Sequence, residues 1–208
     1  NNLPLLYERI AAVMKNRPEA WELIVVDDGS TDGSPAWVRR KSAEDRRVRL
    51  IQLARDFGHQ IAITAGLDHA RHDAAIVMDA DLQDPPEVIP ALLDKWRAGN
   101  EVVYAVRTQR AGESFLKKFT AAMFYRLFAR LTKINMPLDS GDFRLLDRKV
   151  IQALGAMREQ HRFIRAMTCW TGFRQTAVPY ERQSRHSGES KYEAIHLFRL
   201  AMDGLASF

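Results

Sequence analysis

Short apolar runs alternate with helical patterns along the first half of the chain. The runs are rich in Val, Ile and Leu, as in strands that are buried on both faces. The segments between them carry apolar residues at spacings of three and four, the period of an amphipathic helix. The predicted helices span residues 3–16, 34–45, 60–71 and 86–98, and the predicted strands span residues 22–27, 48–53, 75–79 and 101–106. This alternation predicts an α/β domain with a mainly parallel sheet and helices on both of its faces.

The second half of the chain carries two basic amphipathic segments. Residues 113–133 have a wide apolar side that includes Phe115, Phe119 and Phe128, and almost all of their charges are Lys or Arg. Residues 191–208 contain a second apolar helical pattern. A basic helix rich in Phe and Leu is typical of a segment in the headgroup plane of a membrane, although an ordinary helix packed on the domain has the same pattern. We therefore expect amphipathic membrane-interface helices beside the α/β domain.

Two carboxylates directly follow the apolar run that ends at Met78. Asp79 and Asp81 are one residue apart, so an extended chain directs both to the same side. Neighbouring carboxylates repel each other unless a cation lies between them, and oxygen ligands favour a hard ion such as Mg²⁺ or Mn²⁺. Gln83 could add an amide oxygen. Because such an ion keeps open positions that phosphates fill, the segment predicts a metal–diphosphate site at the end of a buried strand.

A second acidic pair supports this interpretation, since an isolated D-x-D sequence also occurs in surface loops. Asp27 and Asp28 follow the apolar run 23–26 and lead into the turn 29–33. In open α/β sheets, ligands bind beyond the carboxyl ends of the strands. Two strands that end in carboxylates predict one acidic edge at which a nucleotide binds.

Composition narrows the class of protein. The chain has 208 residues, of which 46% are hydrophobic and 27% are charged, so it can form one domain with a full core and is neither disordered nor fibrous. A net charge of +5 would favour binding to nucleic acid, to a membrane surface or to phosphorylated small molecules. The acidic motifs argue against a nucleic-acid-binding protein. The single cysteine, Cys169, excludes an internal disulfide and fits a reducing compartment.

The ends of the chain resemble interior sequence. No signal peptide is present, and no apolar run reaches the roughly 18 residues that span a bilayer. The chain begins just before a predicted helix at Leu3, and it closes at residues 204–208 without a stop signal for the last helix. We expect further segments on both sides.

Four motifs resemble those of family 2 glycosyltransferases with the GT-A fold. They are V-V-D-D-G-S-T-D at residues 25–32, D-A-D-L-Q-D-P-P-E at 79–87, D-S-G-D-F-R at 139–144 and R-H-S-G-E-S-K-Y at 185–192. Together they are most similar to the polyprenyl-phosphate glycosyltransferases, the group with dolichol-phosphate mannose synthase and bacterial bactoprenol glucosyltransferases. The resemblance implies a Rossmann-like nucleotide-sugar transferase domain. It also implies a first strand with a P-x-Y-N-E element before Asn1 and membrane-spanning helices after Phe208.

The resemblance implies roles for the residues at the donor edge. Asp79, with its neighbour Ala80, would lie near the ribose of the nucleotide, and Asp27 or Asp28 would accept the imide N–H of the base. The metal ligands would be Asp79, Asp81 and Gln83. The metal would be Mg²⁺ or Mn²⁺, which stabilises the negative charge of the departing nucleoside diphosphate.

The resemblance also implies an acceptor site. Asp142 would be the catalytic base or an organiser of the acceptor, and alternation along an extended chain places Arg144 on the same face. A structural ion pair between these two residues is the alternative. The predicted catalytic residues are Asp81, Asp142 and Arg144, and the predicted phosphate-binding residues are Arg107, Arg110, Ser140, Arg185, Ser190 and Lys191.

The implied activity is inverting transfer of a sugar from a nucleotide sugar to a polyprenyl phosphate. UDP-glucose and undecaprenyl phosphate are the first donor and acceptor, while GDP-mannose and a UDP-linked modified arabinose stay open as donors. A non-catalytic, membrane-peripheral module that binds nucleotide sugars is the alternative from another class. The expected partners are these substrates and a membrane surface, without nucleic acid, and a homo-oligomer stays open. Because nucleotide sugars are cytosolic, the domain would face the cytoplasm at the cell inner membrane.

These expectations divide the chain into four parts. They are a nucleotide-sugar-binding half at residues 1–112, an interface helix at 113–133, an acceptor and catalytic half at 134–190, and a helix at 191–208 that leads to a membrane region.

Overall fold

The computed structural model describes residues 2–108, 140–157, 159 and 162–181. The two amphipathic segments predicted at 113–133 and 191–208 lie outside these residues. Among the helices of the described part, none combines the length and the apolar character that crossing a membrane requires.

The first half of the chain follows the predicted alternation, with bounds that differ by a few residues at most. Its elements are α1 (Leu3–Met14), β1 (Leu23–Asp27), α2 (Ser34–Glu44), β2 (Val48–Gln52), α3 (His59–His69), β3 (Ala74–Val77), a 3-10 turn η1 (Pro86–Val88), α4 (Ile89–Arg97) and β4 (Val102–Arg107). The later elements are β5 (Ser140–Asp147), α6 (Arg148–Ala156), α7 (Ile164–Trp170) and β6 (Gln175–Tyr180). The predicted helix over 86–98 is thus split into η1 and α4, because Pro86 and Pro90 restrict the backbone there.

The strands form two groups. β1 and β2 pair in parallel, and the other four strands form a sheet in the order β3-β5-β4-β6. The prediction of a mainly parallel sheet is correct for β1–β2 and β4–β6 but wrong for β5, which runs antiparallel to both β3 and β4. The regular alternation of helix and strand, which predicts parallel neighbours, ends at β4, so it carried no information on β5.

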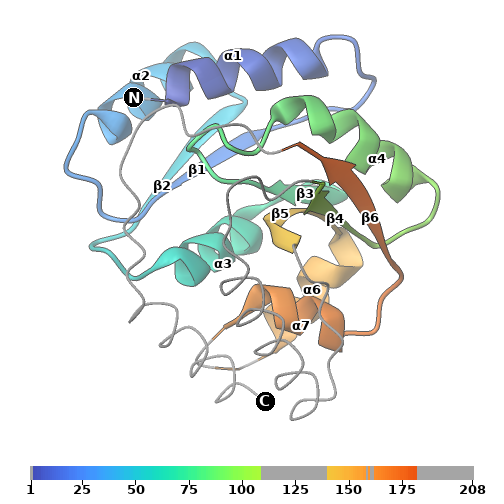
Figure 1. The fold of residues 1–208 in the computed structure, drawn as a ribbon. Coiled ribbons are helices and arrows are strands. Elements are labelled where there is room, and N and C mark those ends of the chain that lie inside the picture. Colours follow the sequence, from blue (N-terminus) through green and yellow to red (C-terminus); the bar gives the residue numbers. More distant parts are fainter. Residues whose placement is uncertain (1, 109–139, 158, 160–161, 182–208) are drawn as a thin grey trace, which may run out of the picture.

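Helices cover both faces of the four-stranded sheet (Figure 1). Val103 and Leu145 pack with apolar residues of α1 and α4, whereas their neighbours Val102 and Leu146 pack with α3, α6 and α7. Side chains of successive strand residues point to opposite faces, so each strand contributes to both cores. The result is a three-layer α/β arrangement that holds the carboxyl ends of β1 and β3 in place.

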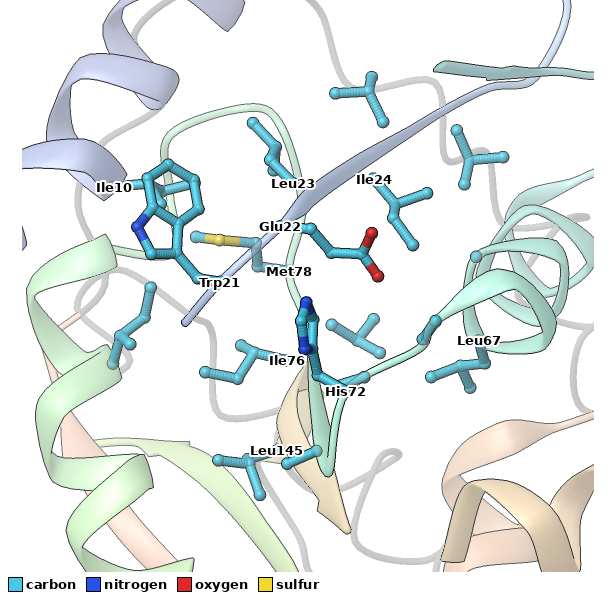
Figure 2. A pocket seen from close by; sticks show the side chains of 18 of the residues that line it. Ile10, Trp21, Glu22, Leu23, Ile24, Leu67, His72, Ile76, Met78 and Leu145 are labelled. Carbon is cyan, nitrogen blue, oxygen red and sulfur yellow. The ribbon is translucent and has the colours of Figure 1, made fainter. Parts of the chain in front are cut away.

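A cavity of about 390 Å³ lies between β1 and β3 (Figure 2). Its walls are mainly apolar: Ile24 and Ile76 come from the two strands, Ile10 from α1 and Leu67 from α3. Among the described residues, β1 pairs with β2 alone and β3 with β5 alone, so each of the two strands has one unpaired edge, and both strands line this cavity. Two unpaired strand edges between helical layers leave space for one more strand, which would satisfy their backbone groups.

The strand predicted before Asn1 would fit this cavity. Alternation along β1 directs the backbone N–H groups of Ile24 and Val26 away from β2 and toward the cavity. In a form of the protein extended at its N-terminus, we expect these two amides to exchange at least tenfold more slowly than in residues 1–208, as measured by NMR hydrogen exchange. The amides of Val103 and Leu145 in the other sheet serve as controls. Equal exchange rates for Ile24 and Val26 in both forms would refute the prediction.

Candidate functional site

The carboxylate of Asp142 is buried near the start of β5. Arg165 of α7 donates to both of its oxygens, from Nε to Oδ1 at 2.8 Å and from Nη2 to Oδ2 at 2.6 Å. Nε2 of His59, the first residue of α3, lies 3.0 Å from Oδ2. Burial alone would raise the pKa of Asp142, but the hydrogen bonds from Arg165 and His59 hold this pKa well below its usual range. The carboxylate therefore stays ionised in the folded protein.

His59 also connects Asp142 with the end of β3. Its Nε2 lies 3.7 Å from Oδ1 of Asp79. The hydrogen bond to Asp142 raises the pKa of His59. The pKa of Asp79 is raised by burial and by its carboxylate neighbours Asp84, Asp142 and Asp81. The acidic ends of β3 and β5 thus meet at one imidazole.

The loop after β3 is held by its own backbone and by the core. Oδ1 of Asp81 accepts the backbone N–H of Gln83 at 3.0 Å. Leu82 has a φ of 66°, a left-handed conformation that is rare for a residue other than glycine, and its side chain is buried. It packs in the core cluster that includes α1 and α4. Burial of this side chain stabilises the strained backbone and fixes the direction of the residues beside it.

The oxygen atoms of this loop suit a hard divalent cation. Asp79 and Asp81 offer carboxylates, and Gln83 offers an amide oxygen. Burial raises the pKa of Asp79 most, and the neighbouring carboxylates Asp84, Asp142 and Asp81 raise it further, so a cation at this position would relieve their repulsion. Over the residues that are described, no group of three or more His, Cys, Asp or Glu side chains is arranged to hold a metal. Amide, phosphate or water oxygens would therefore complete the coordination.

Arg107 ends β4 beside the start of β5. Its Nε lies 3.4 Å from the hydroxyl oxygen of Tyr180, which donates to Oδ1 of buried Asp84 at 2.7 Å. Burial raises the pKa of Tyr180 to about 12. A Cβ atom on Gly141 would lie 3.4 Å from Nη2 of Arg107, and Ser140 pairs with the residue before Arg107. Arg107 and Ser140 thus share one end of the sheet with Asp142.

Arg144 lies in the interior rather than at the surface of the site. Its Nη1 donates to the hydroxyl of Thr168 at 2.7 Å, and its Nη2 donates to the carbonyl of Gly141 at 2.8 Å. Its Nε has no hydrogen-bond partner among the described residues, and burial lowers the pKa of Arg144 to about 10. This guanidinium faces α7, as Asp142 does, and it influences Asp142 through charge. In this arrangement it is too deeply buried to contact a substrate phosphate.

Asp27 and Asp28 both fix backbone segments at the end of β1. Asp27 is buried and accepts from the backbone N–H of Ser30 at 3.1 Å and from the side chain of Gln52 at 3.2 Å. Asp28 accepts the backbone N–H groups of Phe57 and Gly58 at 2.8 and 2.9 Å. Asp28 thereby ties the end of β1 to the segment that leads to His59. Asp27 and Asp28 both lie at the end of β1, the edge at which the sequence predicts the nucleotide.

Substitution of Asp28 tests this connection. Asp28→Ala removes the acceptor of the Phe57 amide and one of the two acceptors of the Gly58 amide, which also donates to Oδ1 of Asp56 at 3.0 Å. We expect the free energy of unfolding to fall by about 1–3 kcal/mol in urea denaturation. Asp32→Ala is the matched control, because Asp32 is exposed and accepts a single backbone bond, from Ser34 at 2.8 Å. Its expected loss is below about 1 kcal/mol. Equal losses for the two variants would contradict a connecting role for Asp28.

The structure brings together Asp79 and Asp142, and it adds two residues that sequence reasoning missed, His59 and Arg165. His59 follows β2 in the segment R-D-F-G-H-Q, so the rule that sites lie beyond strand ends could have found it. Arg165 lies in a short helix without a motif, and nothing in the sequence marks it. The predicted residues Arg110, Arg185, Ser190 and Lys191 lie outside the described residues.

Comparison with known proteins shows the family to which the chain belongs. Residues 1–155 match the family described as Glycosyl transferase family 2. The chain is 52% identical over 202 residues to the uncharacterized glycosyltransferase YkcC of Bacillus subtilis (strain 168), and the match covers 97% of this chain and 62% of that protein. It is 35% identical over 206 residues to the bactoprenol glucosyl transferase of Shigella phage SfV, over 99% of this chain and 67% of that protein. The chain thus spans roughly two thirds of the length of these relatives.

The fold also has solved counterparts. Glucosyl-3-phosphoglycerate synthase from Mycobacterium tuberculosis, in complex with Mn²⁺, uridine-diphosphate-glucose and phosphoglyceric acid, matches with a TM-score of 0.58 and 17% identity, over 89% of this chain and 67% of that one. At this identity the likeness concerns the fold alone, and it confirms the predicted GT-A-like α/β fold. The family match over residues 1–155 and the two relatives agree with each other. The chain belongs to glycosyl transferase family 2.

Proposed function

We propose that this chain is the catalytic domain of an inverting, metal-dependent glycosyltransferase that moves a sugar from a nucleotide sugar to a polyprenyl phosphate. The observation that supports this most is the meeting of Asp79 with Asp142 across His59, at 3.7 and 3.0 Å. Asp79 belongs to the edge predicted for the donor, and Asp142 to the strand predicted for the acceptor. The simplest interpretation is that donor and acceptor react between Asp79 and Asp142.

The donor side needs stabilisation of negative charge. When bound, a divalent cation would neutralise charge on the departing nucleoside diphosphate, and Asp79, Asp81 and Gln83 are the residues that would hold it. Asp27 or Asp28 is proposed to accept a hydrogen bond from the base, since both carboxylates lie where β1 ends. Arg107 and Ser140, together with Arg110, Arg185, Ser190 and Lys191, are proposed phosphate-binding residues.

The acceptor side needs orientation more than proton removal. The second pKa of a phosphate monoester is about 6, so the acceptor phosphate is mostly dianionic at neutral pH. One of its oxygens would form the new bond to the anomeric carbon while the bond from that carbon to the nucleoside diphosphate breaks, and the diphosphate leaves with the electron pair. Because Asp142 is engaged by Arg165 and His59, it suits the role of an organiser better than that of a base.

UDP-glucose is the proposed donor and undecaprenyl phosphate the proposed acceptor. A relative at 35% identity is a bactoprenol glucosyl transferase, and a neighbour of the same fold holds UDP-glucose with Mn²⁺. GDP-mannose and a UDP-linked modified arabinose are the alternative donors. The acceptor lipid implies a location at the cell inner membrane with the domain facing the cytoplasm, where the segments 113–133 and 191–208 would contact the membrane surface.

Nucleotide binding tests the donor side of the proposal. We expect calorimetry to show binding of UDP that depends on Mn²⁺ and is at least tenfold tighter than binding of GDP, in a form of the protein extended at its N-terminus. Preference for GDP would move the donor to the mannosyl alternative. Absence of binding by either nucleotide, with the protein folded, would overturn the catalytic proposal.

A further inference from the structure

Three side chains from separate parts of the chain form one connected unit around Asp142. Arg165 comes from α7, Asp142 from β5 and His59 from α3. Arg165 occupies both carboxylate oxygens, whereas His59 contacts only Oδ2. The side chains of His59, Arg165 and Asp142 are 38%, 24% and 5% exposed, respectively. The most exposed member is thus the one that approaches Asp79.

Hydrogen bonds hold the backbone of α7, which carries Arg165, in place. The backbone carbonyl of Arg165 accepts from the hydroxyl of Thr168 at 2.8 Å, and the same hydroxyl accepts from Arg144 at 2.7 Å. The first N–H of α7, that of Ile164, donates to the side chain of Gln60 at 3.0 Å, directly beside His59 on α3. Thr168 is fully buried. The helix that carries Arg165 is therefore tied to both of the elements that it must align.

We propose that Arg165 is a positioning residue of the transfer reaction: it fixes the carboxylate of Asp142, which in turn orients His59 against the donor edge at Asp79. This inference deepens the proposed function and rests on it. Arg165 acts through Asp142 and His59 rather than on the reacting atoms. The substrate-facing group of this unit is His59, and Asp142 serves as its buried anchor.

Arginine is suited to this role by its shape. Its planar fork donates two parallel hydrogen bonds to one carboxylate, which fixes the rotation of that carboxylate as well as its position. A lysine at this place would supply charge but only a single point of contact. The angle at which Oδ2 meets His59 depends on that rotation, so loss of the fork would release His59 even where the charge is kept.

The test is sugar transfer by full-length protein carrying Arg165→Lys or Arg165→Gln, with UDP-glucose and undecaprenyl phosphate as substrates. We expect kcat to fall about tenfold for Lys and about a hundredfold for Gln, since a small misplacement in a site costs rate on this scale. The affinity for UDP and Mn²⁺, measured by calorimetry, should stay within threefold of the wild type.

Arg162→Gln is the matched control: Arg162 donates to the carbonyls of Leu154 and Met157 and has no bond to Asp142. It should retain the wild-type kcat even where its melting temperature falls.

A double-mutant cycle separates positioning from a general structural effect. His59→Gln combined with Arg165→Gln should lose little more activity than the worse single variant, because residues that act as one unit are not additive. Additive losses, or a kcat within threefold of the wild type for a folded Arg165→Gln protein, would overturn the proposal.

The positioning role of Arg165 can also be tested without measuring sugar transfer. If the wild type transfers no sugar, the proposed function fails, and a crystal structure of Arg165→Gln then decides on the positioning role. A changed orientation of Asp142 and His59 in that structure would support it. An unchanged orientation of both side chains would overturn it.

Discussion

Asp81→Asn is expected to lower sugar transfer at least a thousandfold while leaving the fold intact. The substitution removes a negative charge from the proposed cation site, so the departing diphosphate loses stabilisation worth about 4 kcal/mol, which corresponds to a factor of about a thousand in rate. The fold is retained because the amide of Asn can still accept the N–H of Gln83, as Oδ1 of Asp81 does at 3.0 Å. The measurement is kcat at saturating Mn²⁺, together with the urea midpoint of each protein.

Asp32→Asn is the control for Asp81→Asn. It makes the same chemical change in the other acidic turn, at an exposed residue outside the proposed metal ligands. We expect its kcat to equal that of the wild type within a factor of two or so, since exposed substitutions away from a site have small effects. Full activity of Asp81→Asn in the presence of Mg²⁺ or Mn²⁺ would exclude Asp81 as an essential metal ligand.

Asp142→Asn is expected to reduce kcat at least a hundredfold and to destabilise the protein. An amide presents one acceptor oxygen instead of two, so it cannot satisfy the fork of Arg165, and its NH₂ group would face a guanidinium or the imidazole of His59. Removal of one partner from a buried ion pair costs about 3–5 kcal/mol, and the part-exposure of Arg165 puts this pair at the lower end. The measurements are kcat and the free energy of unfolding in urea.

Asp147→Asn is the matched control on the same strand. Asp147 ends β5 far along from Asp142, where it accepts from the indole N–H of Trp96 at 2.7 Å and from the backbone N–H of Lys149 at 2.9 Å. Its substitution should lower stability without lowering kcat. Equal loss of kcat in the two variants would mean that damage to β5, rather than the carboxylate of Asp142, is responsible.

The stability difference at Asp142 has a defined pH dependence. The folded-state pKa of Asp142 lies well below the unfolded value of about 3.9, so the stabilising contribution is fully present above that value. It is lost as the pH falls toward the folded-state pKa. The difference in unfolding free energy between wild type and Asp142→Asn should therefore be largest between about pH 5 and 6 and shrink below about pH 4. It should also shrink as the pH rises above about 6.5, because Asp142 raises the pKa of His59 and this second contribution is lost when His59 gives up its proton.

The sequence predicted that carboxylates follow β1 and β3, because the signals for these strand ends are local. Asp27 and Asp79 each follow a run of apolar residues, and strand ends gather at one edge of an α/β sheet, so their placement follows from the alternation alone. Alternation also placed Asp142 and Arg144 on one side of β5, and both do face α7. Alternation could not predict how deeply the side chain of Arg144 is buried, because this depends on the helix that covers it.

The contacts that organise Asp142 were outside the reach of the sequence. His59 and Arg165 lie 83 and 23 residues from Asp142 along the chain. Their meeting depends on how α3 and α7 pack against the sheet, which side-chain periodicity does not specify. The antiparallel direction of β5 could not be predicted for the same reason, because it depends on how the strand pairs in the folded protein and not on its own residue pattern.

Sugar transfer by the full-length protein tests the central proposal most directly. The protein would be incubated with Mn²⁺, radiolabelled UDP-glucose and vesicles that contain undecaprenyl phosphate. A parallel reaction would use radiolabelled GDP-mannose instead of UDP-glucose. We expect a labelled, acid-labile lipid product that requires the lipid phosphate and Mn²⁺ and disappears in Asp81→Asn. A folded protein that binds UDP with Mn²⁺ yet labels no lipid from either donor would contradict it.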